Sequence, residues 1–190
     1  MARTKEFDRG EVLERAMRLF WSQGYAATTT DDLLVAMGIS RQSLYDTFGD
    51  KQALYFEALR LYHHDMAPPA DMPVGPSALG TIRQWLLRVT DKPAEDRKRG
   101  CMGINATVSF CGAEATVTGL AQGTAERAER VFTGLVEAGI ERGEFDAELD
   151  AAAAGRFLYV TLQGLTVRAQ AGASPKALRG AVDFALRSFT

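Results

Sequence analysis

The chain has 190 residues, of which 46% are hydrophobic and 24% charged, and its formal net charge is −2 at pH 7. This length allows one compact core or two small cores that share an interface. No apolar run approaches the roughly 18 residues of a membrane span, and the polar opening MARTKEFDRG lacks the apolar core of a secretion signal, so we expect no membrane anchor and a cytoplasmic location.

The first expected helix runs from about Asp8 to Gln23. Apolar residues between Val12 and Phe20 recur there at helical spacing. A stripe of this kind packs against neighbouring helices, so this helix is expected to cover the two short helices that follow it.

Residues 24–54 contain the signals of two short helices joined by a tight turn. Thr30 is the expected cap of the first, with Asp31 well placed at the positive end of its dipole. Gly38 can adopt the left-handed conformation that ends a helix, and Ser40 is a good cap for the next one. This order of signals fits a helix-turn-helix, whose second helix enters the DNA major groove.

The second of these helices, from about Arg41 to Phe48, has a polar face suited to DNA. Leu44 and Phe48 are four residues apart and face inward. Arg41 can donate two hydrogen bonds to guanine, and Gln42 can pair with adenine. Hydroxyls and helix N-termini can bind phosphate. The predicted DNA-binding residues are Thr28, Thr29, Thr30, Ser40, Arg41, Gln42, Ser43, Tyr45 and Lys51.

A longer helix is expected from Asp50, its cap, to about Met66, and it bridges two domains. Residues 1–60 contain eight Lys and Arg against nine Asp and Glu, so the DNA-binding part is not basic overall. Its positive charge must be local: Arg3 and Lys5 lie in an N-terminal arm, and Arg41 and Lys51 are expected at the groove. We therefore expect few phosphate ion pairs per subunit and a modest salt dependence of DNA affinity.

The stretch from Phe7 to about Leu59 resembles the N-terminal domain of the tetracycline-repressor (TetR) family of transcriptional regulators. The resemblance is continuous and ungapped, and it rests on these residues: Phe20, Gly24, Tyr25, the threonine run, Met37-Gly38-Ile39-Ser40, Leu44-Tyr45, Phe48 and Asp50-Lys51. It implies an all-α protein, with a three-helix DNA-binding domain over residues 1–50 followed by a helical ligand-binding and dimerisation domain over residues 51–190.

The middle of the chain reads as helices separated by polar connectors. Residues 67–80 hold four of the six prolines and form a connector, although a helix from Ser77 to Val89 begins inside its end. The charged stretch DKPAEDRKRG is expected to be a loop. Residues 101–111 suit either a strand or a helix, and we predict a helix because their neighbours are helical; a long helix follows from Glu114 to Gly143.

The last two helices, about 147–171 and 175–189, have more apolar surface than one chain needs to bury. We predict that they pack on a second copy as a four-helix bundle, making the protein a homodimer. The alternative is that they form only the core of one chain. The predicted interface residues are Phe157, Leu158, Leu165, Leu178, Val182, Ala185 and Phe189.

By the same resemblance, the second domain holds an unidentified small-molecule effector among its helices. The order Gly100, Cys101, Met102 and Asn105 resembles the start of a helix beside the ligand cavity in parts of the family. Pockets combine apolar walls with a few polar anchors. The predicted cavity residues are Tyr62, Trp85, Met102, Asn105, Phe132, Tyr159 and Gln163.

Cys101 follows three basic residues and lies near a helix start, which would favour a reactive thiolate and a thiol sensor. The alternative reading is a buried, inert side chain. In a helix, Cys101 and Cys111 would be about 15 Å apart, too far for a disulfide.

Other chemistry has little support in the sequence. His63 and His64 are adjacent, so on a helix they point about 100° apart and suit one ion poorly; we predict no metal and no cofactor. No nucleophile motif or phosphate loop is present, so we predict no enzyme. The predicted function is a ligand-responsive transcriptional regulator that binds a double-stranded inverted-repeat operator as a dimer and acts as a repressor. The alternative is a helical ligand-binding or catalytic protein that uses the helix-turn-helix only as scaffold.

Overall fold

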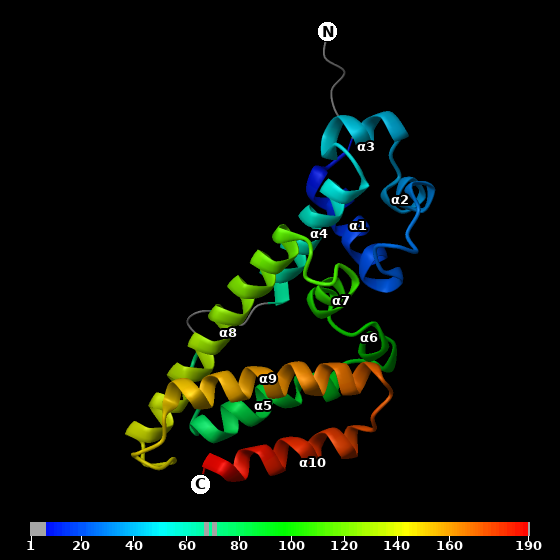
Figure 1. Ribbon diagram of the computed structural model, residues 1–190. Helices are drawn as coiled ribbons and strands as arrows, with labels where there is room; N and C mark the ends of the chain where they lie inside the picture. Colours follow the sequence, from blue (N-terminus) through cyan, green and yellow to red (C-terminus); the bar gives the residue numbers. More distant parts are fainter. Residues whose placement is uncertain (1–6, 67–68, 70–71, 190) are drawn as a thin grey trace. The chain divides into compact units, whose positions relative to one another are not determined.

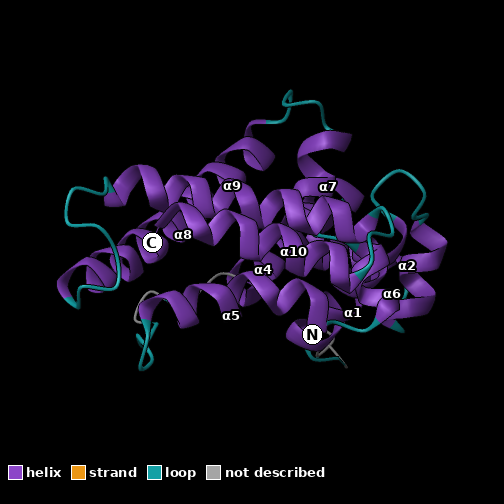
Figure 2. Cartoon of the chain, turned by 90° about the horizontal axis from the view of Figure 1, so that it is seen from below, coloured by secondary structure: helices purple, strands orange, loops and turns teal. Residues whose placement is uncertain are grey.

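The computed structural model describes residues 7–66, 69 and 72–189. Every regular element in this part of the chain is a helix, as Figure 2 shows, so the prediction of an all-α fold is confirmed. No helix among the described residues has both the length and the apolar character to cross a membrane. The chain divides into two compact units: residues 1–66 with 102–121 form unit 1, and residues 67–101 with 122–190 form unit 2.

Unit 1 is built on four consecutive helices that Figure 1 labels α1 to α4. Their bounds are α1 Arg9–Gln23, α2 Thr30–Met37, α3 Arg41–Phe48 and α4 Lys51–Met66. Asp8 caps α1, because its side chain accepts a hydrogen bond from the Glu11 N–H at 2.9 Å. The stripe on α1 is buried as expected, with Val12, Ala16 and Phe20 all at most 3% exposed.

Unit 1 also includes a segment from the middle of the sequence. The helix α7 spans Met102–Ser109 and packs on α4. The stretch at residues 101–111, where strand and helix were both considered, is therefore largely helical as predicted. The first turns of α8, Ala115–Glu141, belong to unit 1 and the rest of α8 to unit 2. The predicted domain boundary at residue 50 follows the order of the chain, whereas α4 and α7 belong to the same compact unit as the first three helices.

Unit 2 contains the remaining helices: α5 Ala78–Asp91, α6 Ala94–Arg99, most of α8, α9 Ala151–Gln170 and α10 Pro175–Leu186, after which residues 187–189 form a 3-10 turn. Figure 1 shows α5, α9 and α10 side by side, and each packs on the other two. The sequence expectation of a loop over the charged stretch was wrong for Ala94–Arg99. This helix has no apolar stripe, and acidic residues in its first turn and basic residues in its last suit its dipole.

Two local contacts in unit 2 depend on particular residues. A Cβ atom added to Gly155 on α9 would lie 2.3 Å from Thr133 Oγ1 and 3.0 Å from the Glu129 carbonyl oxygen on α8, so only glycine permits this approach. Glu144, in the loop after α8, accepts hydrogen bonds from Ser77 Oγ at 2.6 Å and Ala78 N at 2.9 Å. These bonds lower the pKa of Glu144, with the Ser77 bond contributing most.

The apolar residues of α9 and α10 separate into a buried and an exposed set. The predicted interface residues Leu158, Leu165, Leu178, Val182 and Phe189 are at most 4% exposed and belong to the core of unit 2. Because α5 covers that face, they are not available as an outward surface, and the expectation for these five is corrected. Ala185 is partly exposed. The exposed large apolar side chains on these helices are Phe157, Val160, Val167 and Phe184.

Candidate functional site

The turn between α2 and α3 has the expected geometry. Gly38 adopts the left-handed conformation, with φ 69° and ψ 33°, and its N–H donates to the Leu34 carbonyl oxygen at 2.9 Å. Ser40 caps α3 by accepting a hydrogen bond from the Ser43 N–H at 3.1 Å. Leu44 is fully buried. The inward face of α3 is thus anchored, and its N-terminal turn faces outward.

The outward face of α3 carries the side chains predicted to contact DNA. Arg41 and Gln42 are exposed, and each is engaged within the protein: Arg41 pairs with Asp31 on α2, and Gln42 donates to Asp46 at 2.8 Å. Tyr45 is 44% exposed. Exchanging these exposed partners for bases or phosphates has a small cost, because exposed ion pairs contribute little stability.

Ser43 and Ser40 lie at the start of the same helix. Their hydroxyl oxygens are 2.9 Å apart and either can donate to the other. Ser40 Oγ is also occupied as the helix cap. The hydroxyl that accepts in this pair keeps its own hydrogen to donate to a phosphate oxygen.

The three consecutive threonines have different roles. Thr29, rather than Thr30, caps α2: its hydroxyl accepts from the Asp32 N–H, and Asp32 accepts from the Thr29 N–H at 2.9 Å in a reciprocal capping box. Thr28 is fully buried and donates to the Gly24 carbonyl oxygen at 2.7 Å. A buried hydroxyl cannot reach a phosphate, so Thr28 is removed from the predicted DNA-binding residues.

Lys51 occupies the first turn of α4. Asp50 caps this helix as predicted, by accepting from the Ala53 N–H at 2.7 Å. The Lys51 Nζ atom lies over the Tyr25 ring, 4.4 Å from its centroid. Tyr25 was not among the predicted DNA-binding residues, because its place beside Lys51 depends on how the loop after α1 packs against α4. Arg3 and Lys5 lie outside the described residues.

The predicted ligand-site residues are divided between the two units. Tyr62, Met102 and Asn105 lie in unit 1, and the first two are buried. Trp85, Phe132, Tyr159 and Gln163 lie in unit 2, where Phe132 is fully buried in the core.

Within unit 2, Tyr159 brings some of these residues together. The Tyr159 hydroxyl is hydrogen-bonded to Gln163. Burial is the main cause that raises the pKa of this phenol, and the nearby Cys101 adds to the rise. Cys101 is partly exposed. Trp85 Nε1 is buried without a hydrogen-bond partner in the described structure, and the Arg88 guanidinium stacks 4.0 Å from the Trp85 ring centroid.

A groove of about 440 Å³ crosses the surface of unit 2 between α5 and α10. It is lined by Gly80, Arg83, Gln84, Leu87, Thr90, Asp91 and Arg179, and contains none of the predicted ligand-binding residues. Arg83 there is paired with Asp183 at 3.0 Å.

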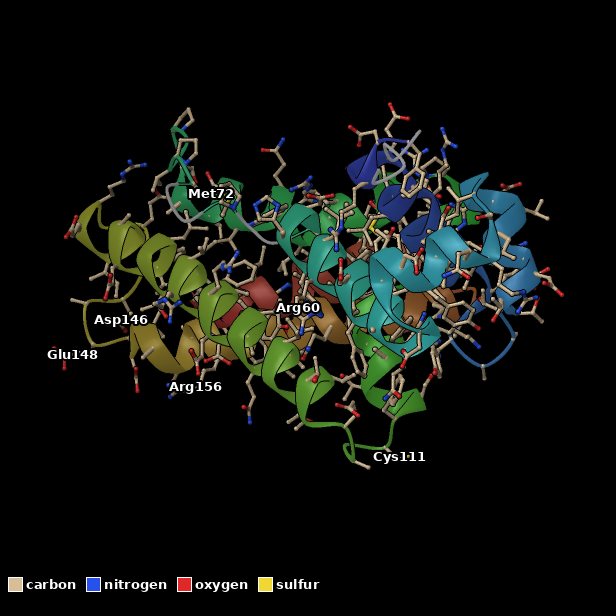
Figure 3. The ribbon with its side chains drawn as sticks, turned by 90° about the horizontal axis from the view of Figure 1, so that it is seen from above. Arg60, Met72, Cys111, Asp146, Glu148 and Arg156 are labelled. Atoms are coloured by element: carbon tan, nitrogen blue, oxygen red, sulfur yellow. The ribbon has the colours of Figure 1, made fainter. Side chains whose placement is uncertain are left out.

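Potential metal ligands are dispersed over the described residues, where no three His, Cys, Asp or Glu side chains form a cluster suited to an ion. His64 Nδ1 lies 3.1 Å from Asp65 Oδ1 at the exposed end of α4. Cys111 is exposed in the turn between α7 and α8, as Figure 3 shows.

Comparison with known families gives matches in both parts of the chain. Residues 12–58 match the family described as bacterial regulatory proteins, tetR family. Residues 79–185 match the tetracyclin repressor-like C-terminal domain. The first match contains α2, α3 and the start of α4.

Relatives and solved structures match almost the whole chain. The uncharacterised HTH-type transcriptional regulator YezE of Bacillus subtilis (strain 168) is 30% identical over 98% of each chain. The HTH-type transcriptional repressor ComR of Escherichia coli (strain K12) is 26% identical over 97% of this chain and 90% of its own. A cysteine-substituted variant of the TetR family regulator CifR, solved with 26-bp double-strand operator DNA, aligns over 100% of both chains with a TM-score of 0.79 and 28% identity. These proteins are regulators rather than enzymes, so the alternative of a helical enzyme or ligand carrier is not favoured.

Proposed function

The chain belongs to the TetR family of transcriptional regulators, and from this premise we propose that it is a cytoplasmic repressor that binds an inverted-repeat operator as a homodimer and is released by a small-molecule effector. The observation that carries the proposal is the anchored α3 helix, whose exposed N-terminal turn presents Arg41 and Gln42. The ComR and CifR relatives, a repressor and an operator-bound regulator, support it.

We assign different roles to the two kinds of DNA contact. Arg41 and Gln42 read bases in the major groove. Tyr45, Lys51 and the hydroxyls of Thr29, Thr30, Ser40 and Ser43 contact phosphates and fix the position of α3. Arg41→Ala should therefore weaken binding and relax sequence preference, whereas Lys51→Ala should weaken binding to all sequences alike. Equal effects of both substitutions on all sequences would contradict the assignment of Arg41 as a base reader.

The exposed apolar face of α9 and α10 is the proposed dimer interface. Phe157, Val160 and Val167 follow one another on one face of α9 and are 46%, 63% and 45% exposed, and Phe184 on α10 is 74% exposed. An exposed glycine in α9, Gly164, has open space around it and leaves room for a partner helix. Large apolar side chains left exposed on neighbouring helices are typical of interaction sites.

The interface can be tested by introducing charge. Phe157→Glu and Phe184→Glu should each shift the molar mass in solution from dimer to monomer, because an unpaired carboxylate cannot be buried at a two-fold contact. Val108→Glu is the matched control, since Val108 is 70% exposed on α7. A wild-type monomer at micromolar concentration would contradict the proposal.

For the effector, we propose a cavity in unit 2, with Trp85 Nε1 as an available donor and Tyr159 and Gln163 as polar anchors. The effector releases the operator if it binds better to the conformation in which the spacing of the two α3 helices of the dimer does not match the separation of the half-sites. Thiol sensing by Cys101 is a separate hypothesis, tested by oxidant-dependent release from DNA: an unchanged response in Cys101→Ser would refute it.

The decisive experiment is selection of fragmented genomic DNA by purified protein, with the Tyr45→Ala, Lys51→Ala double variant in parallel. Enrichment of an inverted repeat by the wild type alone is expected, because both substitutions remove phosphate contacts that position α3. Absence of enrichment by the wild type at moderate salt would overturn the proposed function.

A further inference from the structure

A cluster of five aromatic residues in unit 1 connects segments that are far apart in the sequence. The aromatic cluster consists of Phe20 on α1, Tyr25 in the following loop, Tyr55 and Phe56 on α4, and Phe110 at the end of α7. Tyr25 contacts two of the other rings: the Tyr25 ring centroid lies 4.9 Å from that of Tyr55 and 5.2 Å from that of Phe110.

Phe110 is held in place by its own turn. Its N–H donates to the Ala106 carbonyl oxygen at 3.0 Å, and its carbonyl oxygen accepts from the Ala113 N–H at 2.9 Å. The ring also lies 5.7 Å from that of Tyr55 and is partly buried. A second link joins the same turn to α4, because Gln52 Nε2 donates to Glu114 at 3.4 Å. The position of the turn between α7 and α8 therefore fixes the Phe110 ring against Tyr25.

Tyr25 in turn orients a cation. The Lys51 ammonium lies over the face of the ring, where the aromatic quadrupole attracts positive charge. Holding a lysine side chain in one conformation costs rotamer entropy, and the attraction to the Tyr25 ring offsets this cost. Burial raises the pKa of Tyr25, and the charge of Asp50 adds to this, so the phenol is neutral and the ring attracts the ammonium through its aromatic face.

We propose that Phe110 is a positioning residue for DNA binding: by holding Tyr25 in place, it keeps the Lys51 ammonium at the start of α4, ready for an operator phosphate. This inference rests on the phosphate contact of Lys51 in the proposed function. A displacement of the turn between α7 and α8 would thus weaken DNA binding, since withdrawal of Phe110 frees Tyr25 and the lysine bound to its face.

The test is a double-substitution cycle on the full-length protein with a short random-sequence duplex at low salt, where binding rests on phosphate contacts alone. Phe110→Ala should weaken binding about three- to tenfold and lower the salt slope by about one counterion per subunit, because one oriented cation is lost. In the Lys51→Ala background, Phe110→Ala should have no further effect.

Further variants separate positioning from general damage. Tyr25→Ala removes the ring under Lys51 and should reproduce both effects of Phe110→Ala, and the conservative Tyr25→Phe, which keeps the ring, should restore wild-type affinity and salt slope. Val108→Ala shortens an exposed side chain of α7 outside the aromatic cluster and should leave affinity and salt slope unchanged. Thermal unfolding of each variant shows that the folded state is being compared.

Three results would overturn the inference: an equal loss from Phe110→Ala with and without Lys51, an unchanged salt slope, or no effect of Lys51→Ala on binding. The random duplex makes these outcomes independent of the operator. Failure to enrich an inverted repeat from genomic DNA would instead contradict the proposed function, even where the cycle on random DNA shows coupling.

Discussion

Unit 1 and unit 2 encode their functional surfaces in different ways. In unit 1, the caps, the left-handed Gly38 and the exposed side chains of α3 all fall within 20 residues, and adjacent positions divide between core and surface. In unit 2, the core is assembled from α5, α8, α9 and α10, which come from distant parts of the chain. A site on one short helix can be read locally, whereas a site among several helices depends on which faces pack together.

The sharpest test of this difference uses two adjacent residues of α3. Leu44→Ala should lower the free energy of unfolding by about 3 kcal/mol, because Leu44 is fully buried and its truncation leaves a cavity. Tyr45→Ala should change it by under about 0.5 kcal/mol, as is usual for an exposed position, while weakening DNA binding. Denaturant unfolding and DNA titration of both variants would check this. Similar stability losses in the two variants would show that α3 does not separate core from surface.

The local signals explain which parts of unit 1 the sequence predicted. Gly38, Ser40 and Asp50 were assigned correctly because each acts on backbone groups within a few residues. The cap of α2 was misplaced by one residue, since three consecutive threonines have the same capping chemistry. Asp32, three residues after Thr29, was the available signal, because the capping box requires that spacing.

In unit 2, the helical pattern was sufficient for the long helices but not for their environment. The short helix α6 was missed because its six residues contain no apolar period, and its stabilising charges resemble those of a solvated loop. Leu158 and Phe157 are neighbours with similar hydrophobicity, yet one is buried and the other 46% exposed. Which of them faces outward depends on where α5 packs, and no pattern within α9 specifies that.

A second prediction concerns the close approach of helices in unit 2. Gly155→Ala should lower the free energy of unfolding by about 2 kcal/mol, because the new methyl group would meet the backbone of Thr133 at 2.9 Å as well as its side chain. Gly134→Ala on α8 is the matched control: with open space around it, it should raise stability by about 0.5 kcal/mol through helix propensity. Chemical denaturation measures both. Equal and small effects would contradict the described packing of α9 on α8.

A third prediction uses pH. The pKa of Glu144 is lowered in the folded protein, so its contribution to stability is complete above its ordinary pKa of 4.5 and is lost as pH falls through the lower folded value. Glu144→Gln should therefore be less stable than wild type by about 1 kcal/mol at pH 7, the usual scale for losing a helix-capping group. This gap should narrow as pH falls below 4.5 and close as pH passes through the lowered pKa of the wild-type carboxylate.

The measurement is denaturant unfolding of both proteins between pH 7 and pH 3. Glu148→Gln is the control, because Glu148 is exposed in the same loop after α8, where Figure 3 labels it. A stability gap for Glu144→Gln that stayed constant with pH would rule out the carboxylate as its source.

The smallest expected effect returns to the DNA-binding surface of unit 1. Arg41 pairs with Asp31 in the described structure, and both side chains are more than half exposed. Since an exposed pair of this kind is worth up to about 1 kcal/mol, Asp31→Asn should release Arg41 for DNA and tighten operator binding about threefold. The first turn of α2 should lose some dipole stabilisation, no more than about 0.5 kcal/mol.

Removing any negative charge from a DNA-binding unit also strengthens its attraction to phosphate, so net charge must be separated from the release of Arg41. Glu14→Gln makes the same charge change on α1, where Glu14 pairs with Arg18 at 2.6 Å rather than with a residue of α3. Fluorescence titration with operator and with random DNA should show a larger gain for Asp31→Asn, concentrated on the operator. If both variants gained equally on both DNAs, Asp31 would act only through net charge, and its ion pair with Arg41 would have no influence on DNA binding.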